Sequence, residues 1–422
     1  MMSRKYPTKP ARPAARRGGN GRCLLLLLLV LLGCASCFPR TRTAAWVIRH
    51  DVDSPQKIEE ACAAARQAGF DELLVQVRGR ADAFYRSDIA PWPESLAGAP
   101  PGFDPLAEIL ARCDPLPVHA WLNVYYLWGD TVPPENQAHP GSPAQPWILG
   151  DDEGRPLTDY SEFAKKLNWL EGVYADPASP EYRKLFLQVV RELVSRYPVS
   201  GIHLDFIRYP GDSFGRGGAL GREFAQEIGL DPRLLPDHLN RDVVFDWLHG
   251  RQSPADRVLT TAALYWKEMR AAQVSQLLSE VRRTIKQHGG DDIKLSVAVL
   301  ADAGQAFLEN GQDWRSWSAA EQIDALYPMA YFGSSQRVGA QLREVATGQT
   351  PGSPVRIWAG LGAYIKDSRR IAEEARIARN NGYNGIALFS LGHLLHGPEA
   401  ISAYTGVTGG LISFSSDQFI PL

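Results

Sequence analysis

The sequence lacks the usual marks of several protein classes. A formal net charge of −2 over 422 residues leaves no broad basic field, so nucleic acid is not expected as a partner. The nine histidines form no HExxH pattern, and no spacing of cysteines and histidines suggests zinc, so neither a metal site nor a cofactor is predicted. No GxSxG pattern directly joins a strand run to a helix, which argues against an α/β-hydrolase nucleophile.

Acidic residues are absent from the first 50 positions, where seven lysines and arginines precede residue 23. The apolar run at residues 24–32 follows, too short for a membrane-spanning helix but ordered like an export signal. It ends in "LLGC", which resembles the lipobox of bacterial lipoproteins and predicts lipidation of Cys34 after removal of residues 1–33. An ordinary cleaved signal peptide is the alternative. Ala35 after this cysteine favours the outer membrane, facing the periplasm, if the cell is Gram-negative.

The cysteines that would remain after processing are few. With Cys23 removed and Cys34 acylated, Cys37, Cys62 and Cys113 are left. An odd remainder is not typical of a disulfide framework, so none is predicted.

Eight short apolar runs alternate with stretches of helical length after residue 44, the pattern of βα units around a parallel sheet. The runs are "AWVIRH", "ELLVQVRG", "VHAWLNVYY", "GIHLDFIRY", "IKLSVAVLAD", "ALYPMAYF", "RIWAGLGAY" and "GIALFSLG". Helices are expected at about 54–69, 179–197 and 367–382. We therefore predict an α/β fold, a (β/α)8 TIM barrel over residues 45–404, with a linker at 34–44 and a tail at 405–422. A doubly wound open sheet is the rival, although it lacks a glycine-rich turn after its first strand.

Two connections, residues 125–177 and 211–257, are too long for plain βα loops. They follow the third and fourth strands, so they would lie on the C-terminal face, where barrel active sites form. The glycines of "GRGGALG" match no phosphate-binding turn and are interpreted as flexible loop.

Alternation along the strands separates polar from apolar side chains. Ile202, Leu204 and Phe206 suit packing against helices, whereas His203 and Asp205 lie on the other face. Alternation in the other strands predicts that one cavity at the top of the barrel receives Arg78, Asn123, Asp205 and Asp302.

Asp205 is the leading candidate for chemistry, because a buried carboxylate needs partners or solvent and the barrel mouth supplies both. Cationic neighbours would keep it ionised, as a nucleophile requires. A purely structural carboxylate, paired with Arg78 or Arg208, is the alternative.

Cleavage of a glycosidic bond needs a second carboxyl group as acid. Asp302 has the expected parity, and Asp313 in "GQDW" lies just beyond it; Asp176 is more typical of a helix N-cap. Flat faces for sugar rings are expected from Trp121, Tyr126, Trp128, Tyr209 and Tyr331, although aromatic residues are often core.

Several motifs resemble, in the same order, the glycosyl hydrolase-like 10 family, also called DUF187. They are "LLVQVRGRADAFYRS", "VHAWLNVYYL", "DPASPEYR", "GIHLDFIRYP", "GQDW" and "YPMAY". The resemblance implies a (β/α)8 glycosidase, frequently a lipoprotein, linked to bacterial cell-wall glycan. It places Asp205 at the family's acidic position and Arg78 and Asn123 along the cleft. Some relatives carry two adjacent acidic residues here, whereas Phe206 follows Asp205 in this chain.

We thus expect an envelope-anchored glycoside hydrolase acting on a polysaccharide, with peptidoglycan glycan or another amino-sugar polymer as the expected substrate. Asp205, Asp302 and Asp313 are the candidate catalytic residues. The predicted substrate contacts are Arg78, Trp121, Asn123, Tyr126, His203, Arg208 and Tyr331. A catalytically inactive glycan-binding lipoprotein and a transglycosylase using the same residues are the alternatives.

Overall fold

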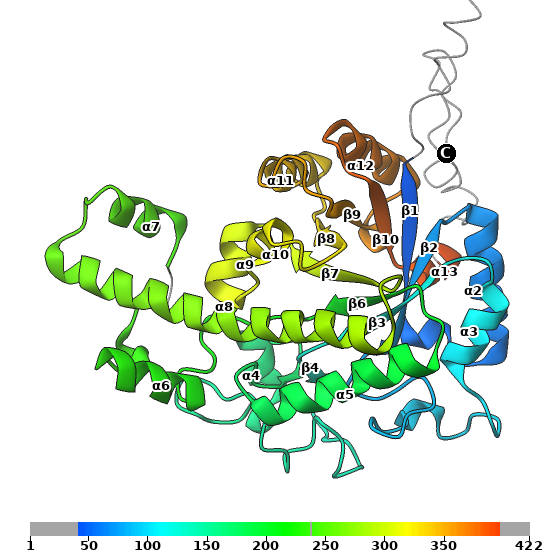
Figure 1. Ribbon diagram of the computed structural model, residues 1–422, viewed down its shortest axis with the longest axis horizontal. Helices are drawn as coiled ribbons and strands as arrows, with labels where there is room; N and C mark the ends of the chain where they lie inside the picture. Colours follow the sequence, from blue (N-terminus) through cyan, green and yellow to red (C-terminus); the bar gives the residue numbers. More distant parts are fainter. Residues whose placement is uncertain (1–40, 237–238, 397–422) are drawn as a thin grey trace, which may run out of the picture. The chain divides into compact units, whose positions relative to one another are not determined.

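Eight parallel strands close into a barrel in the computed structural model, which describes residues 41–236 and 239–396 (Figure 1). Around the barrel the order is β1-β10-β9-β8-β7-β6-β3-β2. The strands are β1 Arg42–Val47, β2 Glu72–Arg78, β3 Val118–Asn123, β6 Gly201–Asp205, β7 Lys294–Leu300, β8 Ala325–Met329, β9 Arg356–Gly362 and β10 Gly385–Phe389. Each overlaps one of the eight apolar runs. The predicted (β/α)8 barrel is therefore confirmed, and the open sheet is excluded.

Helices cover the outside of the barrel. They are α2 Pro55–Ala68, α3 Pro105–Cys113, α5 Pro180–Arg196, α8 Pro254–His288, α9 Ala303–Asn310, α10 Trp314–Ala319, α11 Ser335–Thr347, α12 Ser368–Asn380 and α13 Leu391–His396. Side chains cap several of them at the expected positions: Ser54 accepts a hydrogen bond at the start of α2, and Asp367 at the start of α12. Within the described residues no helix is both long and apolar enough to cross a bilayer.

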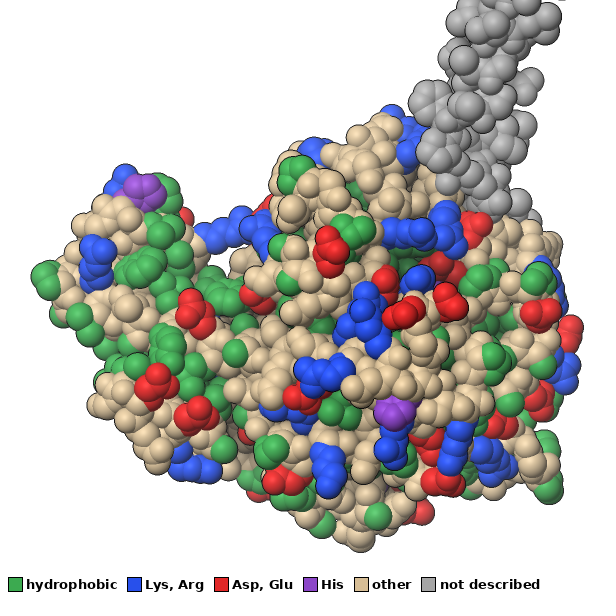
Figure 2. Space-filling view, viewed as in Figure 1, with side chains coloured by type: hydrophobic (Ala, Val, Ile, Leu, Met, Phe, Trp, Pro, Cys, Tyr) green, Lys and Arg blue, Asp and Glu red, His purple; other side chains and the backbone are tan. Residues whose placement is uncertain are grey.

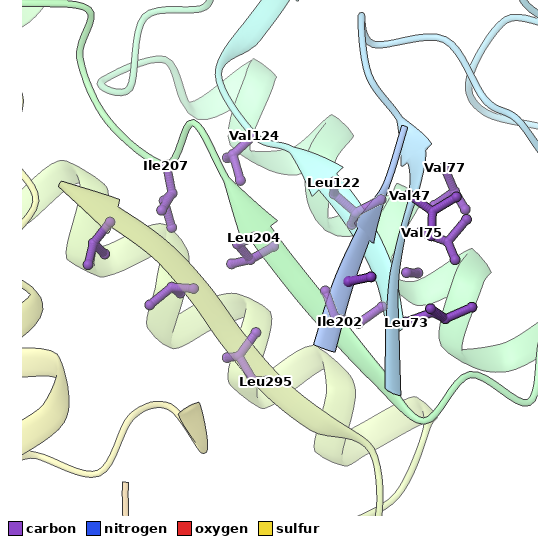
Figure 3. Close-up of a cluster of buried hydrophobic side chains, with 14 of the residues drawn as sticks. Val47, Leu73, Val75, Val77, Leu122, Val124, Ile202, Leu204, Ile207 and Leu295 are labelled. Atoms are coloured by element: carbon purple, nitrogen blue, oxygen red, sulfur yellow. The ribbon is translucent and has the colours of Figure 1, made fainter. Parts of the chain in front are cut away.

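The alternation along the strands explains the core. Leu73 and Val75 of β2, Leu122 of β3, and Ile202 and Leu204 of β6 share the outer face, where they pack under the helices (Figure 3). The inner face carries a separate aromatic cluster that includes Trp46, Trp121, Tyr327 and Trp358. The barrel interior is therefore filled by side chains up to the level of the strand ends.

The connection after β3 contains a small antiparallel hairpin, β4 Tyr126–Trp128 paired with β5 Val173–Tyr174. The short helix α4 Glu162–Leu167 lies in the same connection. Tyr125 and Val124 continue the backbone hydrogen bonds of β3 toward Phe206 and Asp205, which fixes the hairpin above the barrel.

The connection after β6 contains two helices, α6 Ala219–Ile228 and α7 Arg241–Leu248, and α6 begins within the "GRGGALG" segment that was predicted to be flexible loop. Together with the first half of α8 they form a projection, which we call the arm (left in Figure 1). The arm has its own hydrophobic core, and hydrophobic side chains gather on it in the space-filling view (Figure 2). Its core residues are Leu220, Phe224, Leu235, Leu239, Ala262, Ala263 and Trp266. "GRGGALG" thus leads into a helix, with Gly218 at its N-cap.

A disulfide bond joins Cys62 of α2 to Cys113 of α3, contrary to the prediction of no disulfide framework. Both cysteines are fully buried and their Cα atoms lie 5.0 Å apart. The two residues are 51 positions apart in the sequence, so the pairing follows from the packing of neighbouring helices and not from any local spacing. Four predicted features lie outside the described residues: the signal segment 1–33, the lipidation site Cys34, residues 34–40 of the linker and the tail 405–422.

Candidate active site

A pocket of about 330 Å³ opens at the carboxyl ends of the barrel strands. We call it the mouth pocket. Its walls come from six strands or the turns after them: β1, β2, β3, β6, β8 and β10. It is lined by Trp46, Ile48, Arg49, Gln76, Trp121, Asp205, Phe206, Arg208, Met329, Tyr331 and Phe389. Four residues that the sequence singled out therefore come together here: Asp205, Trp121, Arg208 and Tyr331.

Asp205 is the last residue of β6, and only 7% of its surface is exposed. Its Oδ1 accepts a hydrogen bond of 2.7 Å from the Phe206 backbone N–H. Burial raises the pKa of Asp205 to about 6, against the opposing effects of that N–H and of the Arg208 charge. The Arg208 charge does favour the ionised form, as expected from the cationic neighbours, but desolvation is the larger effect.

Phe206 lines the mouth pocket, although alternation along the strand placed it on the outer face with Ile202 and Leu204. Its backbone φ is +49°, a left-handed conformation that is uncommon for a non-glycine residue. The strand ends at Asp205, and this turn brings the Phe206 ring to the pocket wall. There the ring lies 5.0 Å from the ring of Tyr126, and the Arg208 guanidinium lies 5.0 Å from its centroid. Such strain often accompanies functional sites.

A second carboxylate, which the sequence analysis missed, lies beside the mouth pocket. Glu171 Oε1 lies 2.7 Å from Arg208 Nη2, and Glu171 Oε2 accepts a hydrogen bond of 2.8 Å from the Tyr174 hydroxyl. The negative charge of Glu171 also opposes ionisation of Asp205. Glu171 comes from the β4–β5 hairpin, so strand parity in the barrel could not point to it. The aromatic segments "YLW" and "VY" of the hairpin were the only local signal.

His203 lies below the pocket and supports its floor. It is fully buried; its Nε2 accepts a hydrogen bond of 3.1 Å from Trp46 Nε1, and its Nδ1 lies 2.9 Å from Ser296 Oγ. Burial holds the pKa of His203 well below its ordinary value, consistent with a neutral ring whose Nε2 is an acceptor. The structure therefore places His203 behind Trp46, not among the pocket-lining residues.

Arg78 and Asn123 also lie outside the pocket lining. The register of β2 against β3 shifts between Gln76 and Arg78, which turns Arg78 to the outer side of the barrel. There Arg78 donates to the Asn123 carbonyl and, over 3.2 Å, to the Tyr182 hydroxyl. Asn123 Nδ2 donates to the Gly79 carbonyl at 2.8 Å, holding the turn after β2. Both residues are buried, and their contacts support the loops around the pocket.

Asp302 and Asp313 do not reach the mouth pocket. Strand β7 ends at Leu300, so alternation no longer applies at residue 302, and Asp302 is the N-cap of α9. It lies 2.8 Å from Arg241 Nη2. Although burial favours the neutral form, hydrogen bonds from Gln305 and Arg241 leave the pKa of Asp302 below its ordinary value. Asp313 caps α10 and lines a different hollow, of about 500 Å³, between α7 and the α9–α10 region.

The described residues contain no group of three or more histidine, cysteine, aspartate or glutamate side chains arranged to hold a metal ion.

Solved structures with the same barrel include glycosidases. The catalytic domain of β-amylase from Paenibacillus polymyxa is 10% identical, with a TM-score of 0.52 and coverage of 84% of this chain and 93% of that chain. α-L-Fucosidase isoenzyme 2 from Paenibacillus thiaminolyticus is 14% identical, with a TM-score of 0.53 and coverage of 87% and 48%. At these identities the likeness concerns the fold.

Relatives found by sequence have a higher identity to this chain than these structures have. Glycosyl hydrolase YngK of Bacillus subtilis (strain 168) is 23% identical over 323 residues, 71% of this chain and 54% of YngK. Glycosyl hydrolase DigH of Escherichia coli (strain K12) is 30% identical over 149 residues, 33% of this chain and 31% of DigH. The chain thus matches about half the length of YngK and a third of DigH. The family model for glycosyl hydrolase-like 10 matches residues 42–375. The chain therefore belongs to the glycosyl hydrolase-like 10 family.

Proposed function

We propose that the protein is a glycoside hydrolase whose mouth pocket cleaves a glycosidic bond with Asp205 as general acid. The observation that carries this proposal is the buried Asp205 carboxyl, with a pKa of about 6, in an aromatic pocket at the mouth of the barrel. Near neutral pH such a group can give its proton to the leaving glycosidic oxygen and regain one from water. This assignment replaces the nucleophile role expected from the sequence.

Glu171 is the partner carboxylate in this proposal. Its ion pair with Arg208 balances its negative charge beside the pocket. An ionised carboxylate there stabilises the positive charge that develops on the sugar ring, or activates the attacking water. Hydrolysis is then balanced: the glycosidic C–O bond breaks, water adds to the sugar carbon, and the proton returns to the acid.

The proposed substrate is peptidoglycan glycan or another amino-sugar polymer at the cell envelope. Three observations support it: the basic and apolar start of the chain, the "LLGC" motif, and the family membership. The Cys62–Cys113 disulfide also suits an oxidising compartment outside the cytoplasm. Lipidation at Cys34 would anchor the protein, so Cys34→Ala should move it from the membrane to the soluble fraction. Unchanged fractionation, with no lipid label on the wild type, would argue against the anchor.

A catalytically inactive glycan-binding barrel is the second candidate. It is favoured by the position of Asp302 and Asp313 outside the mouth pocket and by the engagement of Glu171 with Arg208 and Tyr174. Binding needs only aromatic rings and hydrogen-bonding groups.

Product release from peptide-free peptidoglycan glycan, followed by mass spectrometry, tests both candidates. The wild type should release fragments and Asp205→Asn should not, whereas Asp313→Asn is the matched control from outside the mouth pocket. Binding of the glycan by all three proteins without cleavage would support the inactive barrel. The absence of both binding and cleavage would contradict the proposed substrate.

A further inference from the structure

Two partly exposed tyrosines follow strands on opposite sides of the barrel. Tyr364 lies in the 3-10 turn Ala363–Ile365 directly after β9, and Tyr126 begins β4 just after β3. In the closed order of eight strands, β9 and β3 are four places apart in either direction. The two tyrosines therefore approach the mouth pocket from opposite ends of one barrel diameter.

Tyr364 extends the aromatic lining of the mouth pocket toward solvent. Its ring centroid lies 6.1 Å from that of Tyr331 and 5.9 Å from that of Phe389, and both of these rings line the pocket. Tyr364 itself is 44% exposed. A Cβ atom at Gly362 would come within 3.1 Å of Tyr364 Cε1 and 3.4 Å of Tyr331 Cδ1, so glycine leaves room for this pair.

Tyr126 extends the lining in the opposite direction. Its ring lies 5.0 Å from the ring of Phe206, which lines the pocket, and 5.8 Å from that of Tyr174. The hairpin that carries Tyr126 also carries Glu171, through residues 171–174. Asp205 thus lies in a pocket whose aromatic surface continues outward on two opposite sides.

This arrangement bears on the length of the ligand. Aromatic rings offer apolar faces on which the C–H faces of sugar rings pack. An enzyme that removes single terminal sugars holds the end of the chain in a pocket that is closed on one side. The rest of the chain then leaves the pocket on the other side of the broken bond only. Outward rings on both sides instead suit a chain that continues past the pocket in both directions.

We propose that the mouth pocket binds the interior of a polymeric glycan, with sugar rings packed on Tyr364 on the β9 side and on Tyr126 on the β3 side. The proposal rests on the proposed function and deepens it, because it assigns the substrate as a polymer cut at internal bonds. Tyr364 is a substrate-binding residue in this account, away from the reacting atoms.

The test compares long peptide-free glycan strands with a short oligosaccharide of the same linkage, using the full-length protein in detergent. For Tyr364→Ala the KM for long strands should rise about tenfold relative to the KM for the short substrate, the loss expected for one ring contact. Tyr364→Phe should restore the wild-type ratio, because the ring makes the contact. Tyr265→Ala, which removes a half-exposed tyrosine of the arm, is the matched control and should leave the ratio unaltered.

The sizes of the first products give an independent readout. Internal cutting by the wild type should produce fragments of many lengths before the smallest product accumulates. A single small product from the outset, or an equal effect of Tyr364→Ala on long and short substrates, would overturn the proposal. If the wild type cuts neither substrate, the proposed function fails, and the inference is then tested by binding of long strands alone. Weaker binding by Tyr364→Ala than by the wild type supports the inference, and equal binding overturns it.

Discussion

Arg208 Nη2 lies 2.7 Å from Glu171 Oε1, so an ion pair joins the turn after β6 to the β4–β5 hairpin above the barrel. Arg208 follows Asp205 by three residues and lines the same pocket. The pair therefore brings a second carboxylate, from a segment 34 residues earlier in the chain, to the group that we propose as the acid.

Glu171→Gln should lower kcat by about a hundredfold or more, the size of effect typical of a lost catalytic carboxylate. The amide keeps the shape of the side chain but loses the negative charge. Glu162→Gln is the control, because Glu162 is an exposed carboxylate of α4 in the same insertion, bonded to Thr131 Oγ1 at 2.9 Å. Equal kcat values for the two variants would show that Glu171 takes no part in the chemistry.

Asp205 should reduce stability at neutral pH. Its folded pKa of about 6 lies above the ordinary value of 3.8, so between these pH values the folded protein binds more protons than the unfolded chain. Stability therefore falls as pH rises through this window. A pKa shift of this size lowers the free energy of unfolding by about 3 kcal/mol above pH 6.

Asp205→Asn removes this ionisation. Relative to the wild type the variant should gain free energy of unfolding at pH 7.5, by up to about 3 kcal/mol, and the gain should disappear near pH 4. Denaturant unfolding at the two pH values measures the difference. A gain that is the same at both values would mean that Asp205 does not titrate as described.

Asp302 should matter for stability and not for turnover. Asp302→Ala removes the N-cap of α9, where the carboxylate accepts a hydrogen bond of 3.0 Å from the Gln305 backbone N–H. The expected loss is about 1 kcal/mol in the free energy of unfolding. Asp302→Asn retains a good capping residue and serves as the control. A large fall in kcat for Asp302→Asn would return this residue to the list of candidate acids.

The disulfide should contribute to stability, since it links positions 51 residues apart. A loop of this length corresponds to about 4 kcal/mol if the bond acts by restricting the unfolded chain. Thermal unfolding of Cys62→Ala/Cys113→Ala should show a clearly lower midpoint than the wild type. Reductant should lower the midpoint of the wild type and leave that of the double variant unaffected. Insensitivity of both proteins to reductant would contradict the bond.

The barrel and the position of Asp205 could be predicted from the sequence because both depend on local periodicity. Eight apolar runs mark the strands, and alternation places Asp205 at the end of β6 on the inner face. Strand alternation gave the wrong position wherever a strand stopped being regular. A register shift turns Arg78 outward, the left-handed turn at Phe206 brings its ring to the pocket, and the end of β7 at Leu300 leaves Asp302 to a helix cap.

Glu171 and the disulfide could not be predicted for a different reason. Both depend on which distant segments pack together. The hairpin that carries Glu171 is two short strands within a long connection, and the cysteines come from neighbouring helices. Neither contact leaves a periodic signal in the sequence.

The pH dependence of kcat/KM on glycan tests the central claim most directly, because it reports the ionisation of essential groups in the free enzyme. With Asp205 as general acid, kcat/KM of the wild type should fall as pH rises above about 6, following the raised pKa of this carboxyl. Asp205→Asn should lose most activity and show no such descending limb. A wild-type rate that instead increases through pH 6, or a descending limb that persists in Asp205→Asn, would contradict Asp205 as the proton donor.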